Sequence, residues 1–367
     1  MAFRRIVLPL ALFAASGLVL AGCAGGADAA GAGTPADGRI AVVASTDVYG
    51  QIVEAIGGDR VDVTSIVSSS SQDPHSFEPT PRDQLAVSRA DLIVENGAGF
   101  DSFIDGLIDA SGTEAPVLTA VEFSHDWPEN EGHDEDASTG STTEEAHEDH
   151  ADDDASTGSA TEDSATEGSA TEGSATEEDD HADHDHGDHG HVEGFNEHVW
   201  YDAHTIEHLA EEIAHELGEI SPDDAAMFTA NYEEFAAGVA ELESGLAGID
   251  ADHAGDEIFV TEPVPLYLTI AAGLVNVAPD AFTEAVEEGQ DVPASTLLDA
   301  TKLLEAGTVR AVIVNAQTGG AETNAVIDDA ETAGIPIVEF TETLPDGQTY
   351  LSWMQSNIEA LAGALDG

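Results

Sequence analysis

The sequence predicts an α/β protein of two lobes, each a mostly parallel sheet covered by helices, with one long helix bridging the lobes. Short apolar segments alternate with helical patterns in both halves of the chain, which is typical of parallel sheets with crossover helices. One uninterrupted helical pattern separates the two halves. An acidic, histidine-rich insertion without apolar periodicity divides the first half.

Each lobe is expected to contain three buried strands. The first lobe is assigned to residues 39–221 and the second to residues 251–367, and the apolar segments within them are short and bounded by turn or helix signals. Helical patterns lie between these segments, for example at 47–57, 82–90, 295–306 and 322–333. The expected strands are 40–45, 61–67 and 92–95 in the first lobe, and 258–261, 309–315 and 335–340 in the second.

The bridging helix is expected at residues 222–250. Ser221 can cap a helix, and Pro222 suits its first turn. At 1.5 Å per residue, a helix of this length extends roughly 40 Å. It would span both lobes as a stiff connector, so we expect opening of the protein to be a small adjustment within a lobe.

The first residues have the pattern of a bacterial lipoprotein signal. Arg4 and Arg5 precede an apolar run at 6–20, which is short for a membrane span, and Cys23 follows small residues. We expect residues 1–22 to be removed and Cys23 to carry a lipid, with residues 23–38 as a flexible stalk. The protein would then be anchored to the extracytoplasmic face of the cell membrane. Because Cys23 is the only cysteine, a disulfide framework and a cysteine-based zinc site are excluded.

The chain is strongly acidic, with 75 acidic residues, 8 basic residues and a formal net charge of -67. Nucleic acids and anionic lipid head groups need a basic face, so this charge excludes them as electrostatically held partners. Attraction of cations and adaptation to a saline habitat both remain compatible with it.

The insertion at 122–193 consists mainly of acidic residues, Ser, Thr, Gly and His. Its repeats of the type Ser-Ala-Thr-Glu at 159–178 bury nothing that could offset chain entropy, so we expect disorder. Imidazole and carboxylate groups at this density would capture metal ions weakly at many sites, although a simple solvated linker remains the alternative. The densest cluster comprises His181, His184, His186, His189 and His191.

Four other candidate metal ligands lie on loops, three of them beyond the ends of expected strands and one before an expected helix. Ligands of open α/β sheets bind at the carboxyl ends of the strands. His75 lies in a proline-rich loop after the strand at 61–67, and His198 directly follows the insertion. Glu262 and Glu342 each follow a strand of the second lobe. Two imidazoles from one lobe and two carboxylates from the other would make a four-ligand site in the cleft.

Four motifs resemble landmarks of one family, the metal-binding receptors of bacterial ABC importers for zinc and manganese (cluster A-I solute-binding proteins). The resemblance covers residues 40–365 and implies two bridged lobes with one metal site between them. It also implies an ABC permease as partner, no catalysis, and a His-rich acidic loop, mostly in zinc members. The motifs are Ala-Ile-Gly-Gly-Asp-Arg-Val at 55–61, Asp-Pro-His-Ser-Phe-Glu-Pro-Thr-Pro at 73–81, Ala-Asp-Leu-Ile-Val-Glu-Asn-Gly-Ala-Gly at 90–99 and His-Val-Trp at 198–200.

The resemblance also bears on the choice of metal. His75 and His198 match the two first-lobe histidines of the family. Glu262 occupies the third position, where zinc members commonly have His and many manganese members have Glu. Glu342 occupies the fourth position, where the family commonly has Asp. The His-rich loop and the general order of metal affinities favour Zn²⁺, with Mn²⁺ as the alternative.

Four further points complete the interpretation of the sequence. The segment Asn315-Ala-Gln-Thr318 would supply hydrogen bonds that orient the ligands. A surface metal buffer or adhesin without a transporter would share the same site. His204, Glu207 and His208 match the H-x-x-E-H pattern of inverted zinc peptidases, but a solvated helix face in a segment rich in His and Glu gives the same pattern. We expect a monomer.

Overall fold

The computed structural model describes residues 38–130, 192 and 194–367. The expected signal peptide, the lipidation site Cys23 and most of the stalk and the insertion lie outside these residues, as do His181, His184, His186, His189 and His191. In the part of the chain that is described, no helix is both long enough and apolar enough to cross a membrane.

Each lobe contains a four-stranded, fully parallel sheet, which confirms the predicted α/β class. The first sheet has the order β2-β1-β3-β4 and the second the order β6-β5-β7-β8. One short strand at an edge of each sheet was not predicted. The strands are β1 Ile40–Thr46, β2 Val61–Val67, β3 Leu92–Glu95, β4 Val117–Thr119, β5 Glu257–Val260, β6 Val275–Asn276, β7 Val309–Asn315 and β8 Ile337–Phe340.

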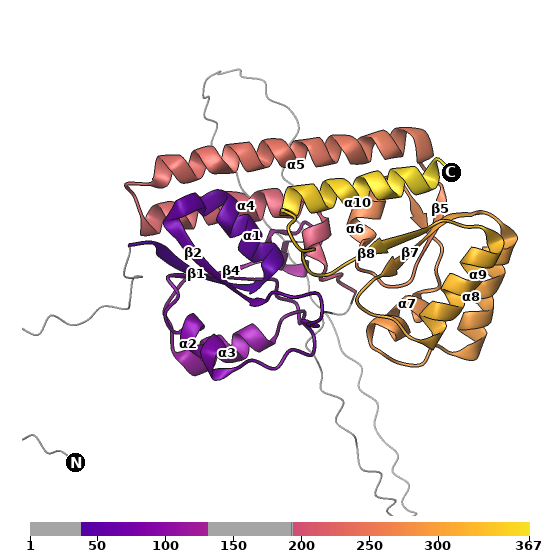
Figure 1. The fold of residues 1–367 in the computed structure, drawn as a ribbon, viewed down its shortest axis with the longest axis horizontal. Helices are drawn as coiled ribbons and strands as arrows, with labels where there is room; N and C mark the ends of the chain where they lie inside the picture. The colour runs from indigo at the N-terminus through magenta and orange to yellow at the C-terminus, as the bar shows by residue number, and fades with distance from the viewer. Residues whose placement is uncertain (1–37, 131–191, 193) are drawn as a thin grey trace, which may run out of the picture. The chain divides into compact units, whose positions relative to one another are not determined.

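Helices cover both faces of each sheet (Figure 1). Successive side chains of a strand point to opposite faces, so Val42 packs in a different core cluster from Val43, and Ile258 in a different one from Phe259. The helices of the first lobe are α1 Asp47–Gly57, α2 Pro81–Val87, α3 Phe103–Ser111 and α4 Ala203–Ile220. Those of the second lobe are α6 Leu266–Ala271, α7 Asp280–Glu287, α8 Ala294–Ala306, α9 Ala321–Ala333 and α10 Tyr350–Leu365.

A helix of 29 residues, α5 Ala225–His253, is the longest in the described part of the chain. It contacts α1 and α4 of the first lobe and α6 and α10 of the second. It begins three residues later than predicted, because residues 222–224 form a turn in which Ser221 Oγ donates to Asp224 Oδ2 at 2.9 Å. At 1.5 Å per residue its length is roughly 43 Å, as expected for a stiff connector.

One hydrophobic core is continuous through both lobes along α5. The same cluster of buried residues contains Val42 of the first sheet, Phe235 of α5, and Val260 and Trp353 of the second lobe. Hydrogen bonds also join the lobes, since Leu344 N donates to an Asp47 carboxylate oxygen at 3.0 Å. The shared core opposes a wide hinge motion.

Replacing Phe235 with alanine should lower the free energy of unfolding by about 3–5 kcal/mol, because it leaves a cavity in this shared core. Phe235 is 3% exposed, and its ring lies 5.9 Å from that of Tyr350 on α10. Denaturant unfolding of the full chain measures the change, with the exposed Glu233→Ala as the matched control on the same helix. A Phe235→Ala protein as stable as the control would contradict the shared core.

Residues 122–130, at the start of the insertion that we expected to be disordered, are folded. They include the end of one short 3-10 turn, η2 Ala120–Phe123, and the whole of another, η3 Pro128–Asn130. The Trp127 ring packs edge-to-face on Phe195 at 5.1 Å. The contact therefore joins two folded parts of the first lobe that are far apart in the sequence.

Candidate metal centre

His75 lies on the loop that follows β2. Its backbone N–H donates to Asp73 Oδ1 at 2.9 Å, while Ser76 Oγ donates to Asp73 Oδ2 at 2.7 Å. The Asp73 carboxylate therefore holds the loop through both of its oxygens. The His75 ring packs edge-to-face against Phe100, with 4.9 Å between the ring centroids. The loop and the aromatic contact together fix the position of the imidazole.

His198 is 1% exposed and lies just before η4 Val199–Tyr201, the turn that leads into α4. Its Nδ1 lies 2.7 Å from Asn196 Oδ1. Because an amide oxygen can only accept, Nδ1 carries the proton and Nε2 keeps the lone pair that a metal ion needs. The ring packs edge-to-face on the buried Trp200 at 5.1 Å, so Trp200 packs beside the site.

The second lobe supplies two buried carboxylates, Glu262 after β5 and Glu342 after β8, which are 3% and 4% exposed. Asn315 Nδ2 donates to Glu262 Oε2 at 3.0 Å and to Glu342 Oε1 at 2.6 Å. Thr318 Oγ1 donates to the other oxygen of Glu262 at 2.5 Å. The end of β7 thus orients both side chains, as the sequence led us to expect.

Gln317 connects the Glu342 loop with the first lobe. Its Oε1 accepts hydrogen bonds from Glu342 N at 2.6 Å and from Thr343 N at 3.0 Å. Its Nε2 donates to the backbone oxygen of Ser70, in the loop that carries His75, at 3.1 Å. One side chain therefore sets the spacing between the loops of His75 and Glu342.

The loop of His198 is also attached to the second lobe. Asn196 Nδ2 donates to Pro263 O at 3.1 Å, and Tyr267 Oη of α6 donates to Asn196 O at 2.9 Å. Tyr201 Oη donates to Thr341 O, next to Glu342, at 2.8 Å. The candidate ligands of the two lobes are thus positioned relative to each other by direct hydrogen bonds.

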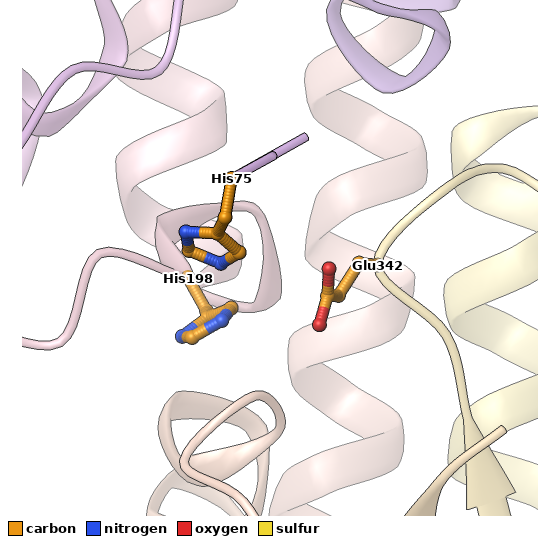
Figure 2. Close-up of side chains that lie close together, drawn as sticks. All are labelled: His75, His198 and Glu342. Carbon is orange, nitrogen blue, oxygen red and sulfur yellow. The ribbon is translucent and has the colours of Figure 1, made fainter. Parts of the chain in front are cut away.

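Three of the four predicted ligands converge. Possible ligand atoms of His75, His198 and Glu342 all lie within 4.8 Å of one another. Figure 2 shows the two imidazoles close together with the Glu342 carboxylate facing them. Such spacing suits a single ion bound at about 2.0–2.2 Å from each donor. Glu262 is not part of this group, because Asn315 and Thr318 hold its carboxylate beside it.

Burial makes the carboxylates of the second lobe unfavourable as bare charges. Burial and the neighbouring Glu262 raise the pKa of Glu342 to about 8. Burial also raises the pKa of Glu262, although the hydrogen bonds from Thr318 and Asn315 lower it. Placing two ionised carboxylates in a dry site costs free energy, and a divalent cation between them would offset that cost.

Two carboxylates that the sequence did not single out also face His198. Glu197, His198 and Glu287 form a second group with ligand atoms within 4.8 Å of one another, and Glu287 Oε1 lies 3.9 Å from His198 Nε2. The sequence does offer a signal for Glu197, because it is a carboxylate directly before the candidate ligand His198. Glu287 is one of many acidic residues on helix ends, so nothing in the sequence distinguishes it.

The H-x-x-E-H motif lies on the first turns of α4. His204 and His208 are exposed, and their Nε2 atoms are 3.2 Å apart. Two groups of three potential ligands occur among the described residues, and this motif contributes to neither. A zinc peptidase centre needs a third ligand, so the geometry favours the solvated helix face.

Comparisons with known proteins agree with this architecture. The "Manganese-binding lipoprotein MntA" of Halalkalibacterium halodurans is 38% identical over 93 residues, which cover 25% of this chain and 31% of that protein. The matched segment therefore spans less than a third of this relative. Other curated relatives are named as substrate-binding lipoproteins of metal ABC transporters.

Solved structures share the fold at low sequence identity. Zn(II)-bound AdcA of Streptococcus pneumoniae has a TM-score of 0.59 and 17% identity, over 90% of this chain and 58% of that one. A mutant form of a Mn-bound periplasmic metal binding protein of Candidatus Liberibacter asiaticus has a TM-score of 0.58 and 15% identity, over 89% of this chain and all of that one.

A family model covers nearly all of the folded chain. It is described as "Zinc-uptake complex component A periplasmic" and matches residues 42–364, which include both sheets, the bridging helix α5 and all four predicted ligands. The chain belongs to this family, ZnuA.

Proposed function

We propose that this protein is an extracytoplasmic receptor that binds one divalent transition-metal ion between its lobes and delivers it to an ABC permease. The convergence of His75, His198 and Glu342 from three separate loops carries the proposal. Membership of the ZnuA family supports it, as do the metal ions named for the relatives. Transfer of the ion to the permease involves no covalent chemistry, so the protein acts as a receptor and not as an enzyme.

His75, His198 and Glu342 would bind the ion directly, and Glu262 would complete a four-ligand site. The Glu262 carboxylate lies beside Glu342, with Asn315 Nδ2 hydrogen-bonded to both. A small rotation of Glu262 away from Thr318 would bring one oxygen to the ion. Attraction between the positive ion and the Glu262 carboxylate would drive that rotation.

Zn²⁺ is the preferred cargo in this proposal. Two imidazoles with two carboxylates form a donor set that serves Zn²⁺ well, and affinities for N/O sites follow an order in which Zn²⁺ exceeds Mn²⁺. The carboxylates also suit the harder Mn²⁺, which is therefore the competing ion to test. The His-rich part of the insertion would capture ions first and raise their concentration near the cleft.

The proposed cellular location rests on the sequence. A lipid on Cys23 would tether the receptor, as a monomer, to the outer face of the membrane beside the permease. A surface metal buffer without a transporter would use the same ligands. Deletion of the gene distinguishes the two, because only loss of a transport receptor should prevent growth when metal is limiting.

The proposal is tested by metal analysis and competitive titration of residues 24–367. A chelator that buffers the free metal concentration separates a tight ion in the cleft from weak binding by the insertion. We expect one tight equivalent of Zn²⁺, bound more strongly than Mn²⁺. Absence of any tight equivalent would contradict the assignment of the cleft as the metal site.

Replacing Asn315 with alanine should lower the affinity for Zn²⁺ about 10–100-fold, the usual cost of losing a hydrogen bond that orients a metal ligand. Its amide contacts both Glu262 and Glu342, and its loss frees both side chains. The same buffered titration measures the effect. Asn324→Ala, on the exposed face of α9, is the matched control and should bind Zn²⁺ as the unchanged protein does. Equal affinities in the two variants would refute the orienting role.

A further inference from the structure

The second group of potential ligands, Glu197, His198 and Glu287, shares His198 with the first. Glu197 and His198 come from the loop before η4, and Glu287 comes from the end of α7 in the other lobe. The group mixes one imidazole with two carboxylates, and its ligand atoms lie within 4.8 Å of one another. This is the same spacing as in the group of His75, His198 and Glu342.

The exposure of the three side chains differs along the group. Glu197 and His198 are buried, whereas the Glu287 side chain is 23% exposed. Glu287 is therefore the member of this group that reaches solvent. One of its oxygens, Oε1, is itself buried and makes no hydrogen bond within the described part of the protein.

The charge on these side chains is unfavourable without a cation. The Glu287 carboxylate is only 23% exposed and lies near those of Glu197, Glu262 and Glu342. Helix α7 brings this side chain into the cleft although three other carboxylates face it. A divalent ion next to His198 would turn that repulsion into attraction.

We propose that Glu197, His198 and Glu287 form a second, alternative position for the same metal ion, at which the ion is held between solvent and its final ligands. This inference rests on the proposed function. His198 Nδ1 is engaged by Asn196, so Nε2 alone can bind an ion, and one ion occupies either position. The protein therefore still binds a single tight equivalent.

His198 acts as the pivot between the two positions. An ion bound to His198 can exchange Glu287 and Glu197 for His75 and Glu342 one ligand at a time, without returning to water. Stepwise exchange avoids the cost of removing all hydrating waters at once. The position with two carboxylates is also the harder donor set, so it should contribute more to the binding of Mn²⁺ than to that of Zn²⁺.

Glu287→Gln tests this inference in the full chain, because it removes the carboxylate that would bind the ion and keeps the shape of the side chain. Glu288→Gln is the matched control, since Glu288 is the next residue and is exposed. Zn²⁺ loading is followed by stopped-flow competition with a chromophoric chelator, at less than one equivalent of metal. Glu287→Gln should lower the association rate about tenfold with one equivalent retained, and Glu288→Gln should leave it unchanged.

A second measurement isolates the alternative position. In a His75→Ala background the ion must depend on the remaining ligands, so adding Glu287→Gln should lower the residual Co²⁺ affinity at least about tenfold and change the visible Co²⁺ spectrum. Adding Glu288→Gln should do neither. Thermal unfolding of the metal-free variants shows whether each is folded. Glu287→Asp keeps a carboxylate at this position, so it should partly restore the rate of Zn²⁺ loading.

The outcomes separate the two proposals. If Glu287→Gln matches Glu288→Gln in both measurements while the unchanged protein binds one tight Zn²⁺, the alternative position is refuted and the cleft site stands. If the unchanged protein binds no tight Zn²⁺, the proposed function fails instead. Two tight ions bound at once outside the insertion would also refute the inference, because a shared His198 permits only one.

Discussion

Replacing His198 with alanine is expected to lower the affinity for Zn²⁺ at least about 100-fold, or roughly 2.8 kcal/mol. His198 belongs to both groups of potential ligands found among the described residues, so neither group stays complete after its loss. Its removal also leaves the carboxylates of Glu342 and Glu287 without the imidazole that completes either site. The loss should therefore exceed that caused by any outer hydrogen-bond partner.

Buffered competition titration of the full chain measures this loss. His204→Ala is the matched control, because His204 is an exposed histidine only six positions along the chain and lies in neither group. It should leave the tight equivalent intact. Comparable losses in both variants would show that the ion is bound elsewhere, and an effect of His204→Ala alone would favour the H-x-x-E-H motif.

The contrast between His198 and His204 shows what the sequence could predict. Both precede or begin α4, and both are histidines among acidic residues. Only His198 lies on the loop before the helix and matches a family motif, and only His198 is buried. The sequence predicted His75, His198 and Glu342 because each lies on a loop next to a recognisable strand or helix.

Glu287 could not be predicted in the same way. It enters the cleft because α7 ends there, and the packing of α7 depends on contacts such as Phe282 on Phe259, whose rings lie 5.3 Å apart in the core of the second lobe. Such tertiary contacts leave no local pattern. The strands β4 and β6 were missed for a related reason, since segments of two or three residues are too short to show a period.

The ends of helices and strands depend on individual residues near them. Helix α1 begins and ends as predicted, whereas β8 begins two residues later than expected because Pro336 has no N–H to donate to the sheet. Pro336 still accepts a hydrogen bond from Val312 N at 2.9 Å and so places the start of the strand. Glu342 follows the other end of β8. The position of this strand, which Pro336 helps to set, therefore also sets the position of the ligand.

Proton release explains why the same site should respond strongly to pH. A bound ion requires neutral histidines and ionised carboxylates, so every group that is protonated in the metal-free protein must lose its proton on binding. In the metal-free protein Glu342, with a pKa of about 8, keeps its proton near neutral pH. Histidines in general add their protons near pH 6.5. Affinity must therefore fall as the pH falls.

The expected size of this effect is large. One proton released per ion changes the affinity tenfold per pH unit, and Glu342, with a pKa of about 8, supplies one such proton across this range. We expect the Zn²⁺ affinity to fall at least about 100-fold between pH 7.5 and pH 5.5. Titrations at fixed free metal across this range measure the slope, with a chelator whose own protonation is known.

The stability of the metal-free protein should change in the opposite direction. A carboxyl whose pKa is raised by folding binds its proton more tightly in the folded state, so it destabilises the fold once that proton is lost. For Glu342 and Glu287 the penalty is absent below about pH 4.5, grows as the pH rises from there to their folded-state pKa values of about 8 and 9, and is constant above them. The metal-free protein should thus lose stability from these groups as the pH rises, whereas stabilisation by Zn²⁺ should grow. Thermal unfolding with and without Zn²⁺ checks both directions, and a metal-induced shift that stayed constant with pH would contradict a site built from these carboxylates.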